Sequence, residues 1–156
     1  MSYFDSAFIA KFYLDEPESE AIRALAESLG EVHCVAIGRI EVAAVFHRKW
    51  REGAFSAAVF REVSDQFSDD CAASLWQWLP LTASLAEAAA RAIRRTPRTL
   101  FLRSADALHL TCAREHGFRS IYSNDRHVLA AARHFKLKGV NVSYSSPLSG
   151  PREPRR

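Results

Sequence analysis

Four carboxylate side chains stand at positions where they could act together on a metal ion. Hard divalent cations such as Mg²⁺ prefer carboxylate oxygens and keep several of their waters. One or two such ions can generate a hydroxide nucleophile, neutralise a phosphate and stabilise the leaving oxygen of a phosphodiester. The sequence therefore contains candidates for a Mg²⁺ or Mn²⁺ site that cleaves phosphodiester bonds. These candidates are Asp5, Glu41, Asp106 and Asp125.

Two of the four acids follow predicted strands. Asp5 comes directly after a short apolar run at residues 2–4, and Asp125 follows a second run at 120–122 after two intervening residues. In doubly wound α/β sheets, ligands bind beyond the carboxyl ends of the strands. Both acids are therefore expected at the sheet edge where such folds build their sites.

The other two acids lie in predicted helices and also have ordinary structural explanations. Asp106 falls in the first turn of a helix that we expect Ser104 to cap, and an acid there is often only a capping or dipole-favoured residue. Glu41 interrupts an apolar helix face. A bound cation would explain a buried carboxylate there, since burying one unpaired is costly, but Arg39 could pair with it instead. The residues alone leave both interpretations open.

Short apolar runs alternate with helical stretches along the chain. Strands and helices in alternation imply βαβ units, a mostly parallel sheet and helices on both faces. The predicted fold is a three-layer α/β/α sandwich with a central sheet of about five strands. The predicted strands span 2–4, 32–35, 76–81, 120–122 and 140–143, and the predicted helices span 7–14, 17–29, 37–51, 56–75, 82–95, 104–116 and 125–135.

Length and composition indicate one globular domain. The 156 residues are 48% apolar and 25% charged, as in ordinary soluble proteins. No apolar run approaches the roughly 20 residues that cross a bilayer, and the N-terminus has acids where a signal peptide would be basic. We therefore expect a cytoplasmic protein without a membrane partner. Three widely spaced cysteines with no CxxC pair predict reduced thiols and argue against a zinc site.

The net charge of +3 is weak evidence for a nucleic-acid partner, because most of it lies at the C-terminus. Residues 147–156 hold three arginines and one glutamate, which leaves +1 for the rest of the chain. Rich in Pro, Gly, Ser and Arg, this segment is predicted to be a disordered basic tail after a domain of residues 1–146.

A run of arginines precedes the Asp106 helix and is the best candidate for contacting phosphates. Guanidinium groups would position a nucleic-acid backbone without reading its sequence. Alternatively, these cations simply complement a helix C-terminus. His109 lies three residues after Asp106, and we favour a packing role over general acid catalysis. The five arginines are Arg91, Arg94, Arg95, Arg98 and Arg103, in a stretch without an acid.

The chain resembles the PIN-domain ribonucleases, and more narrowly the VapC-type toxins of bacterial toxin–antitoxin pairs. The resemblance runs from Tyr3 to about Ser143. Its motifs are YFDSAFIAKFYLDEPES, IGRIEVAAVFHRK, SADALHLTCAREHG and IYSNDRHV, in the order and at the intervals typical of the family. The resemblance implies a parallel α/β/α fold and endonucleolytic hydrolysis of RNA. It also implies homodimerisation and inhibition by an antitoxin that reaches into the active-site groove.

Carried over by position, the resemblance gives each acid a role. Asp5 and Asp106 would be the main metal ligands. Glu41 would hold a metal-bound water or share the ion, and Asp125 would complete the site or hold a second ion. Ser6 and Ser123 match the hydroxyl positions that support these acids. One departure is Cys34, near where many relatives have Ser or Thr; it puts only a supporting hydrogen bond in doubt.

Other classes of protein fit less well. A response-regulator domain would want paired acids near the first strand, and an aspartyl phosphatase a second Asp where Ala7 stands. The six glycines form no nucleotide-binding loop. A PIN nuclease of RNA processing that is not a toxin and a non-catalytic RNA-binding module remain as alternatives.

Overall fold

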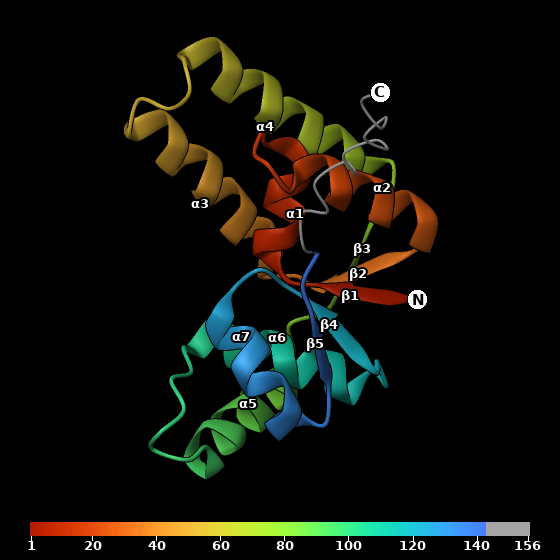
Figure 1. Cartoon of the computed structure of the whole chain (residues 1–156), viewed down its shortest axis with the longest axis vertical. Helices are drawn as coiled ribbons and strands as arrows, with labels where there is room; N and C mark the ends of the chain where they lie inside the picture. Colours follow the sequence, from red (N-terminus) through yellow and green to blue (C-terminus); the bar gives the residue numbers. More distant parts are fainter. Residues whose placement is uncertain (143–156) are drawn as a thin grey trace, which may run out of the picture.

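A central sheet of five parallel strands organises the molecule. The computed structural model describes residues 1–142, and the sheet order within them is β3-β2-β1-β4-β5 (Figure 1). The chain builds outward from β1 to β3 on one side and then returns to place β4 on the other side of β1. The strands are β1 (Ser2–Phe4), β2 (Val32–Val35), β3 (Trp76–Leu79), β4 (Ser120–Tyr122) and β5 (Lys138–Val140).

Helices cover both faces of this sheet. Figure 1 shows α1 to α4 on one face and α5 to α7 on the other. The helices are α1 (Ser6–Tyr13), α2 (Ser19–Leu29), α3 (Gly38–Arg51), α4 (Ala57–Ala72), α5 (Ala83–Arg95), α6 (Ser104–Glu115) and α7 (Arg126–Ala132), followed by the 3₁₀ turn η1 (Arg133–Phe135). The α/β/α sandwich predicted from the sequence is confirmed, and all five strands are parallel.

Each face of the sheet has its own hydrophobic core. Side chains of a strand alternate between faces, so Phe4 packs with α1 to α4 while its neighbour Tyr3 packs with α5 to α7. The same alternation sends Cys34 to the first core and Val35 to the second. Both faces of the central strands are thus buried, which explains their short apolar sequences. All three cysteines are free, as expected.

Several boundaries differ from those of the predicted elements, three of them in the C-terminal part of the fold. The last strand is Lys138–Val140 rather than 140–143, because Lys138 pairs with Ser120 of β4. The helix predicted at 125–135 ends at Ala132 and continues as η1. The cap of α6 is the third difference: Arg103, not Ser104, holds the N-cap position.

The described residues end at position 142. The predicted tail at 147–156 and the domain boundary at 146 lie outside the described residues. Within residues 1–142, no helix combines the length and the apolar character needed to span a bilayer. The strand order predicts where a ligand would bind. The order reverses between β1 and β4, and ligands of open α/β sheets bind at such reversal points.

Candidate active site

Asp5 lies directly beyond β1, at the point where the strand order reverses. Its backbone N–H donates to the carbonyl of Tyr122 in β4, at 3.0 Å. Its side chain caps α1, with Oδ1 accepting from the Phe8 N–H at 2.9 Å. The other oxygen, Oδ2, accepts a short hydrogen bond from the Ser123 hydroxyl. With 3% of its surface exposed, Asp5 is a buried carboxylate held by two donors.

Ser123 connects Asp5 to Asp125. The buried Ser123 hydroxyl donates to Asp5 and accepts from the backbone N–H of Asp125, at 2.9 Å. Asp125 in turn caps α7, since its Oδ1 accepts from the His127 N–H at 2.7 Å. One serine therefore fixes the side chain beyond β1 and the backbone beyond β4.

Asp106 occupies the third position of α6 and makes a two-oxygen ion pair with Arg103. Arg103 Nε lies 2.9 Å from Oδ2 and Nη2 lies 3.2 Å from Oδ1. The backbone N–H of Arg103 also donates to Oδ2, at 3.2 Å, so Asp106 caps its own helix in place of Ser104. Arg103 Nη2 reaches Asp125 as well. A single guanidinium group therefore bridges two of the four acids.

Glu41 is held by a chain of hydrogen bonds that links α3 through His109 of α6 to Tyr3 of β1. Its Oε2 lies 2.7 Å from Nε2 of His109, whose Nδ1 lies 3.1 Å from the Tyr3 hydroxyl. That hydroxyl accepts from the Val35 N–H at 3.1 Å. Since the hydroxyl already accepts one bond, the network assigns its proton to Nδ1 and leaves Nε2–H to donate to Glu41. His109 is 2% exposed and contacts the carboxylate directly.

The environment moves the pKa values of these carboxylates in different directions. Burial raises the pKa of Asp5 to about 6, although His109, Ser123 and the Phe8 N–H act against it. Burial also disfavours ionised Glu41, but the hydrogen bond from His109 and its electrostatic influence, with help from Ser6 and Arg103, lower the pKa of Glu41 overall. For Asp125 the His127 N–H and Arg103 likewise outweigh burial and lower the pKa. Of these three acids, Asp5 is the one whose burial is not outweighed by its hydrogen bonds and neighbouring charges.

All four acids line one cleft of about 360 Å³. Four carboxylates against the two guanidinium groups of Arg48 and Arg103 leave an excess of negative charge. Within residues 1–142, no three metal-ligating side chains yet form a compact cluster, and each acid is hydrogen-bonded to a neighbour instead. The donor set, hard oxygens with excess negative charge around a buried acid of raised pKa, fits a divalent cation.

The five arginines predicted to contact phosphates are divided between separate places. Arg103 lies in the acid cleft, whereas Arg91 and Arg95 line a different cavity. Arg94 and Arg98 are exposed and line neither. A favourable interaction with the C-terminal end of α5 is therefore enough to explain Arg94. It does not explain why the other arginines lie where they do.

Two contributions to the cleft were not singled out by the sequence. Arg48 lies seven residues after Glu41, so two helical turns place it on the same face of α3, and this spacing could have indicated it. The contact between His109 and Glu41 had no such signal, because the residues are 68 positions apart. Ser6 lines the cleft at the start of α1, and its role in supporting the acids stays a prediction.

Comparison with known proteins places this architecture in a family. The family model for the PIN domain matches residues 2–134, so the chain belongs to the PIN domain family. PIN domains are generally nucleases that depend on divalent metal ions. No protein of curated function matches the chain in a sequence comparison.

Two solved structures share the fold at low sequence identity. A chain of FitAB bound to the IR36 DNA fragment is 15% identical, with a TM-score of 0.66 over 90% of this chain and 94% of that one. A chain of FitAcB from Neisseria gonorrhoeae is 17% identical, with a TM-score of 0.65 over 90% of this chain and 97% of that one. At this identity the likeness concerns the fold.

Proposed function

We propose that the protein is a metal-dependent endoribonuclease that hydrolyses RNA phosphodiester bonds, using Mg²⁺ or Mn²⁺. The observation that carries the proposal is the convergence of Asp5, Glu41, Asp106 and Asp125 on one cleft with excess negative charge. Such a cleft repels phosphate unless a cation lies between them. A PIN domain with this arrangement is best explained as a nuclease rather than a module that only binds RNA.

Asp5 and Asp106 are the proposed principal ligands of the metal ion. Asp125 would complete the site, and Glu41 would accept a hydrogen bond from the attacking water. A bound divalent cation supplies a more acidic water and neutralises charge on the scissile phosphate. Because Asp106 and Asp125 share Arg103, this guanidinium must give up part of its contacts when the acids bind a cation.

Other residues of the cleft would orient these acids. Ser123 fixes the carboxylate of Asp5, and His109 fixes that of Glu41 through a 2.7 Å contact. Arg48 is exposed at the cleft and would bind a non-bridging phosphate oxygen of the substrate. Each acid is thus oriented by a neighbour that does not itself need to bind metal.

The test is cleavage of single-stranded RNA by the purified protein with Mg²⁺ or Mn²⁺ and with EDTA. Asp5→Asn and Asp106→Asn should each lower the rate about 100-fold or more, since each removes charge from the proposed metal site. Asp65→Asn removes an exposed acid of α4 and is the matched control. Equal cleavage by wild type and the two site variants, or no cleavage by any protein, contradicts the proposal.

In the cell, the proposed role is that of a cytoplasmic toxin inhibited by a cognate antitoxin. The VapC-like motifs support this role. The fold shared with the chains of FitAB, which is bound to a DNA fragment, and of FitAcB also supports it. The chain expressed alone should arrest growth, and Asp5→Asn should not. Co-expression of a small protein encoded beside it should restore growth and co-purify.

The proposed homodimer and the alternative roles have their own tests. Light scattering measures the mass of the purified protein in solution, and the mass of a monomer would contradict the proposed homodimer. A nuclease of RNA processing would cleave RNA in the same assay without arresting growth or binding an antitoxin. A non-catalytic RNA-binding protein would bind RNA equally well in wild type and Asp106→Asn without cleaving it.

A further inference from the structure

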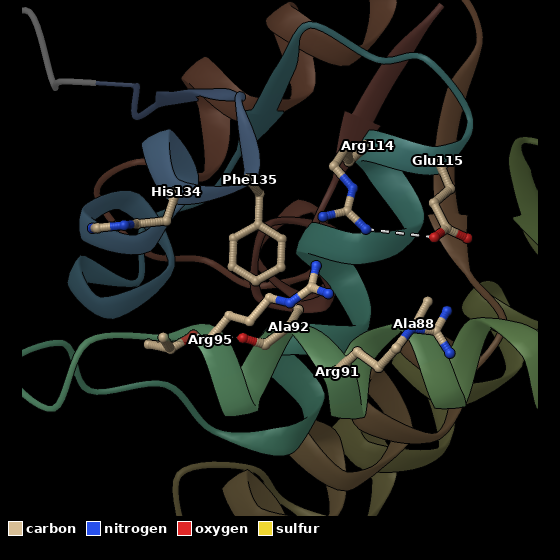
Figure 2. Close-up of a pocket in the computed structure, with 9 residues that line it drawn as sticks. Ala88, Arg91, Ala92, Arg95, Arg114, Glu115, His134 and Phe135 are labelled. Atoms are coloured by element: carbon tan, nitrogen blue, oxygen red, sulfur yellow. Dashed lines mark hydrogen bonds and ion pairs between the residues drawn. The ribbon is translucent and has the colours of Figure 1, made fainter.

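A second cavity, of about 390 Å³, lies where α5, α6 and η1 meet. Arg91 and Arg95 of α5 and Arg114 of α6 line it, and the buried Phe135 ring lies beside them. Figure 2 shows the guanidinium groups of Arg95 and Arg114 extending toward the same space, from two different helices. None of the four acids of the active site lines this cavity.

The charges around this cavity are predominantly positive. Glu115 is the one carboxylate among its lining residues, and it already contacts Arg114, at 3.4 Å. Arg91 lies 3.8 Å from Glu87, a loose pair with both side chains at least half exposed. Within residues 1–142, Arg95 has no ion-pair partner. Converging guanidinium groups repel one another, and an anion in the cavity would remove that cost.

Complementing the helix dipole explains only part of this arrangement. Arg95 and Arg114 both lie in the last turn of their helices, where cations are favoured. Arg91 is one turn earlier in α5, outside the last turn. The dipoles also give no reason for arginines of two helices to line a common cavity. An anionic ligand accounts for both features.

The exposure of these arginines favours a polyanion over a single small anion. Exposed ion pairs each contribute little, so one free phosphate would be held weakly. A nucleic acid gains from releasing condensed counterions and from being held at a second point. Helix α6 supplies that second point, because Asp106 lies in the acid cleft and Arg114 lies eight residues, or about 12 Å, further along its axis.

From this we infer that Arg91, Arg95 and Arg114 bind a backbone phosphate of the RNA strand, at a distance from the bond being cleaved. The inference rests on the proposed function for the identity of the polyanion. Phe135 is 2% exposed and cannot offer a face for base stacking. The contact is therefore with phosphate and independent of sequence.

The experiment measures RNA affinity by fluorescence anisotropy, with a labelled unstructured RNA, over a range of salt concentrations. All proteins carry Asp5→Asn so that the probe survives. Adding Arg91→Gln and Arg95→Gln should weaken binding about fivefold or more and make the salt dependence shallower by about 0.7 for each phosphate that is no longer neutralised. Replacing both arginines by lysine should restore most of the affinity, because the charge is retained.

A matched control removes two arginines from the opposite layer, Arg51→Gln and Arg61→Gln. Arg51 has a loose pair with Glu52 at 3.7 Å, much as Arg91 has with Glu87, and Arg61 is exposed like Arg95. The fold-loss of RNA affinity in this control should be less than half of the fold-loss in the cavity variant. Thermal unfolding checks that both variants fold, and Arg95→Gln alone should give a smaller loss in the same direction.

Equal RNA affinity of the cavity and control variants overturns the inference. So does unchanged RNA affinity together with weaker binding of poly-glutamate, which would make the cavity a site for acidic protein. Cleavage by the protein with native Asp5 separates this failure from that of the proposed function. If the protein cleaves RNA but the cavity variant binds RNA like the control, the nuclease proposal stands and this inference fails. If the cavity variant binds RNA more weakly but the protein does not cleave RNA, only this inference stands.

Discussion

At the residue scale, the four acids differ in what holds them. Glu41 and Asp125 each face a cationic or donor side chain that lowers the pKa, whereas Asp5 is buried and has a raised pKa of about 6. A buried carboxylate in this state stores unfavourable energy that a cation can relieve. Binding sites often include such groups, because function takes precedence over stability there.

Asp5 should therefore make the metal-free protein less stable as pH rises. Its folded pKa of about 6 exceeds the ordinary 3.8, so its stabilising contribution is complete below about pH 4 and is lost as pH rises through about 6. Relative to Asp5→Asn, the wild type should lose about 2 to 3 kcal/mol over this window. Urea unfolding in EDTA measures it, and the comparison cancels groups common to both proteins. Parallel stability profiles would show that Asp5 is not perturbed.

Arg103 should compete with a metal ion for the acids of the cleft. Its guanidinium contacts Asp106 and Asp125, and its half-exposed position screens the interaction only partly. Arg103→Met should strengthen Mn²⁺ binding in the absence of RNA about three- to tenfold, since a competing positive charge is removed. Calorimetric titration measures this, with Arg98→Met as a control at an exposed arginine that lines neither the acid cleft nor the second cavity. Weaker binding in Arg103→Met would instead mean that Arg103 holds the acids in the metal-binding arrangement.

At the scale of elements, the sequence predicted what local patterns determine. The apolar runs of β1 and β4 and the acids that follow them placed Asp5 and Asp125 correctly at the sheet edge. The start of α6 was less predictable, because Asp106 competes with Ser104 for the capping role through the Arg103 N–H. Contacts between distant segments, such as Ser123 with Asp5, depend on strand order, which local patterns do not determine.

Gly38, the first residue of α3, shows how an element positions Glu41, one of the proposed site carboxylates. A Cβ at this position would lie 2.5 Å from Cys34 Sγ and 3.2 Å from Cζ3 of Trp78. Gly38→Ala should therefore displace the start of α3, destabilise the protein by about 1 to 3 kcal/mol, and slow RNA cleavage by moving Glu41. Unfolding and cleavage assays on the same preparation measure both effects.

A double variant separates this crowding from other effects of alanine. Cys34→Ala removes the nearest atom, so Gly38→Ala with Cys34→Ala should recover part of the stability and activity that Gly38→Ala alone removes. The Trp78 contact remains and limits the recovery. Cys34→Ala by itself is the control, because Cys34 Sγ also lies 3.9 Å from His109 Nδ1. Additive losses in the double variant would show that the two residues do not clash.

At the scale of the whole molecule, the acid cleft joins the two helical layers. Asp5 caps α1 and Glu41 lies in α3 on one face of the sheet, whereas Asp106 lies in α6 and Asp125 caps α7 on the other. The layers have separate hydrophobic cores. A cation bound by acids of both layers would therefore add a second direct link between the layers, beside the contact of His109 with Glu41.

This arrangement predicts that Mg²⁺ stabilises both layers together. Saturation at about 100 times the dissociation constant should add about 2.7 kcal/mol to the free energy of unfolding. Hydrogen exchange should slow in the first turns of both α3 and α6, because Asp106 would bind the cation and Glu41 would hold a water beside it. Asp106→Asn should abolish the protection in α3 as well as in α6, although the substitution lies in the other layer, and Asp65→Asn should change neither. Protection in α3 that survives Asp106→Asn would mean that Glu41 and Asp106 act on separate ions, and the cleft would then not couple the two layers.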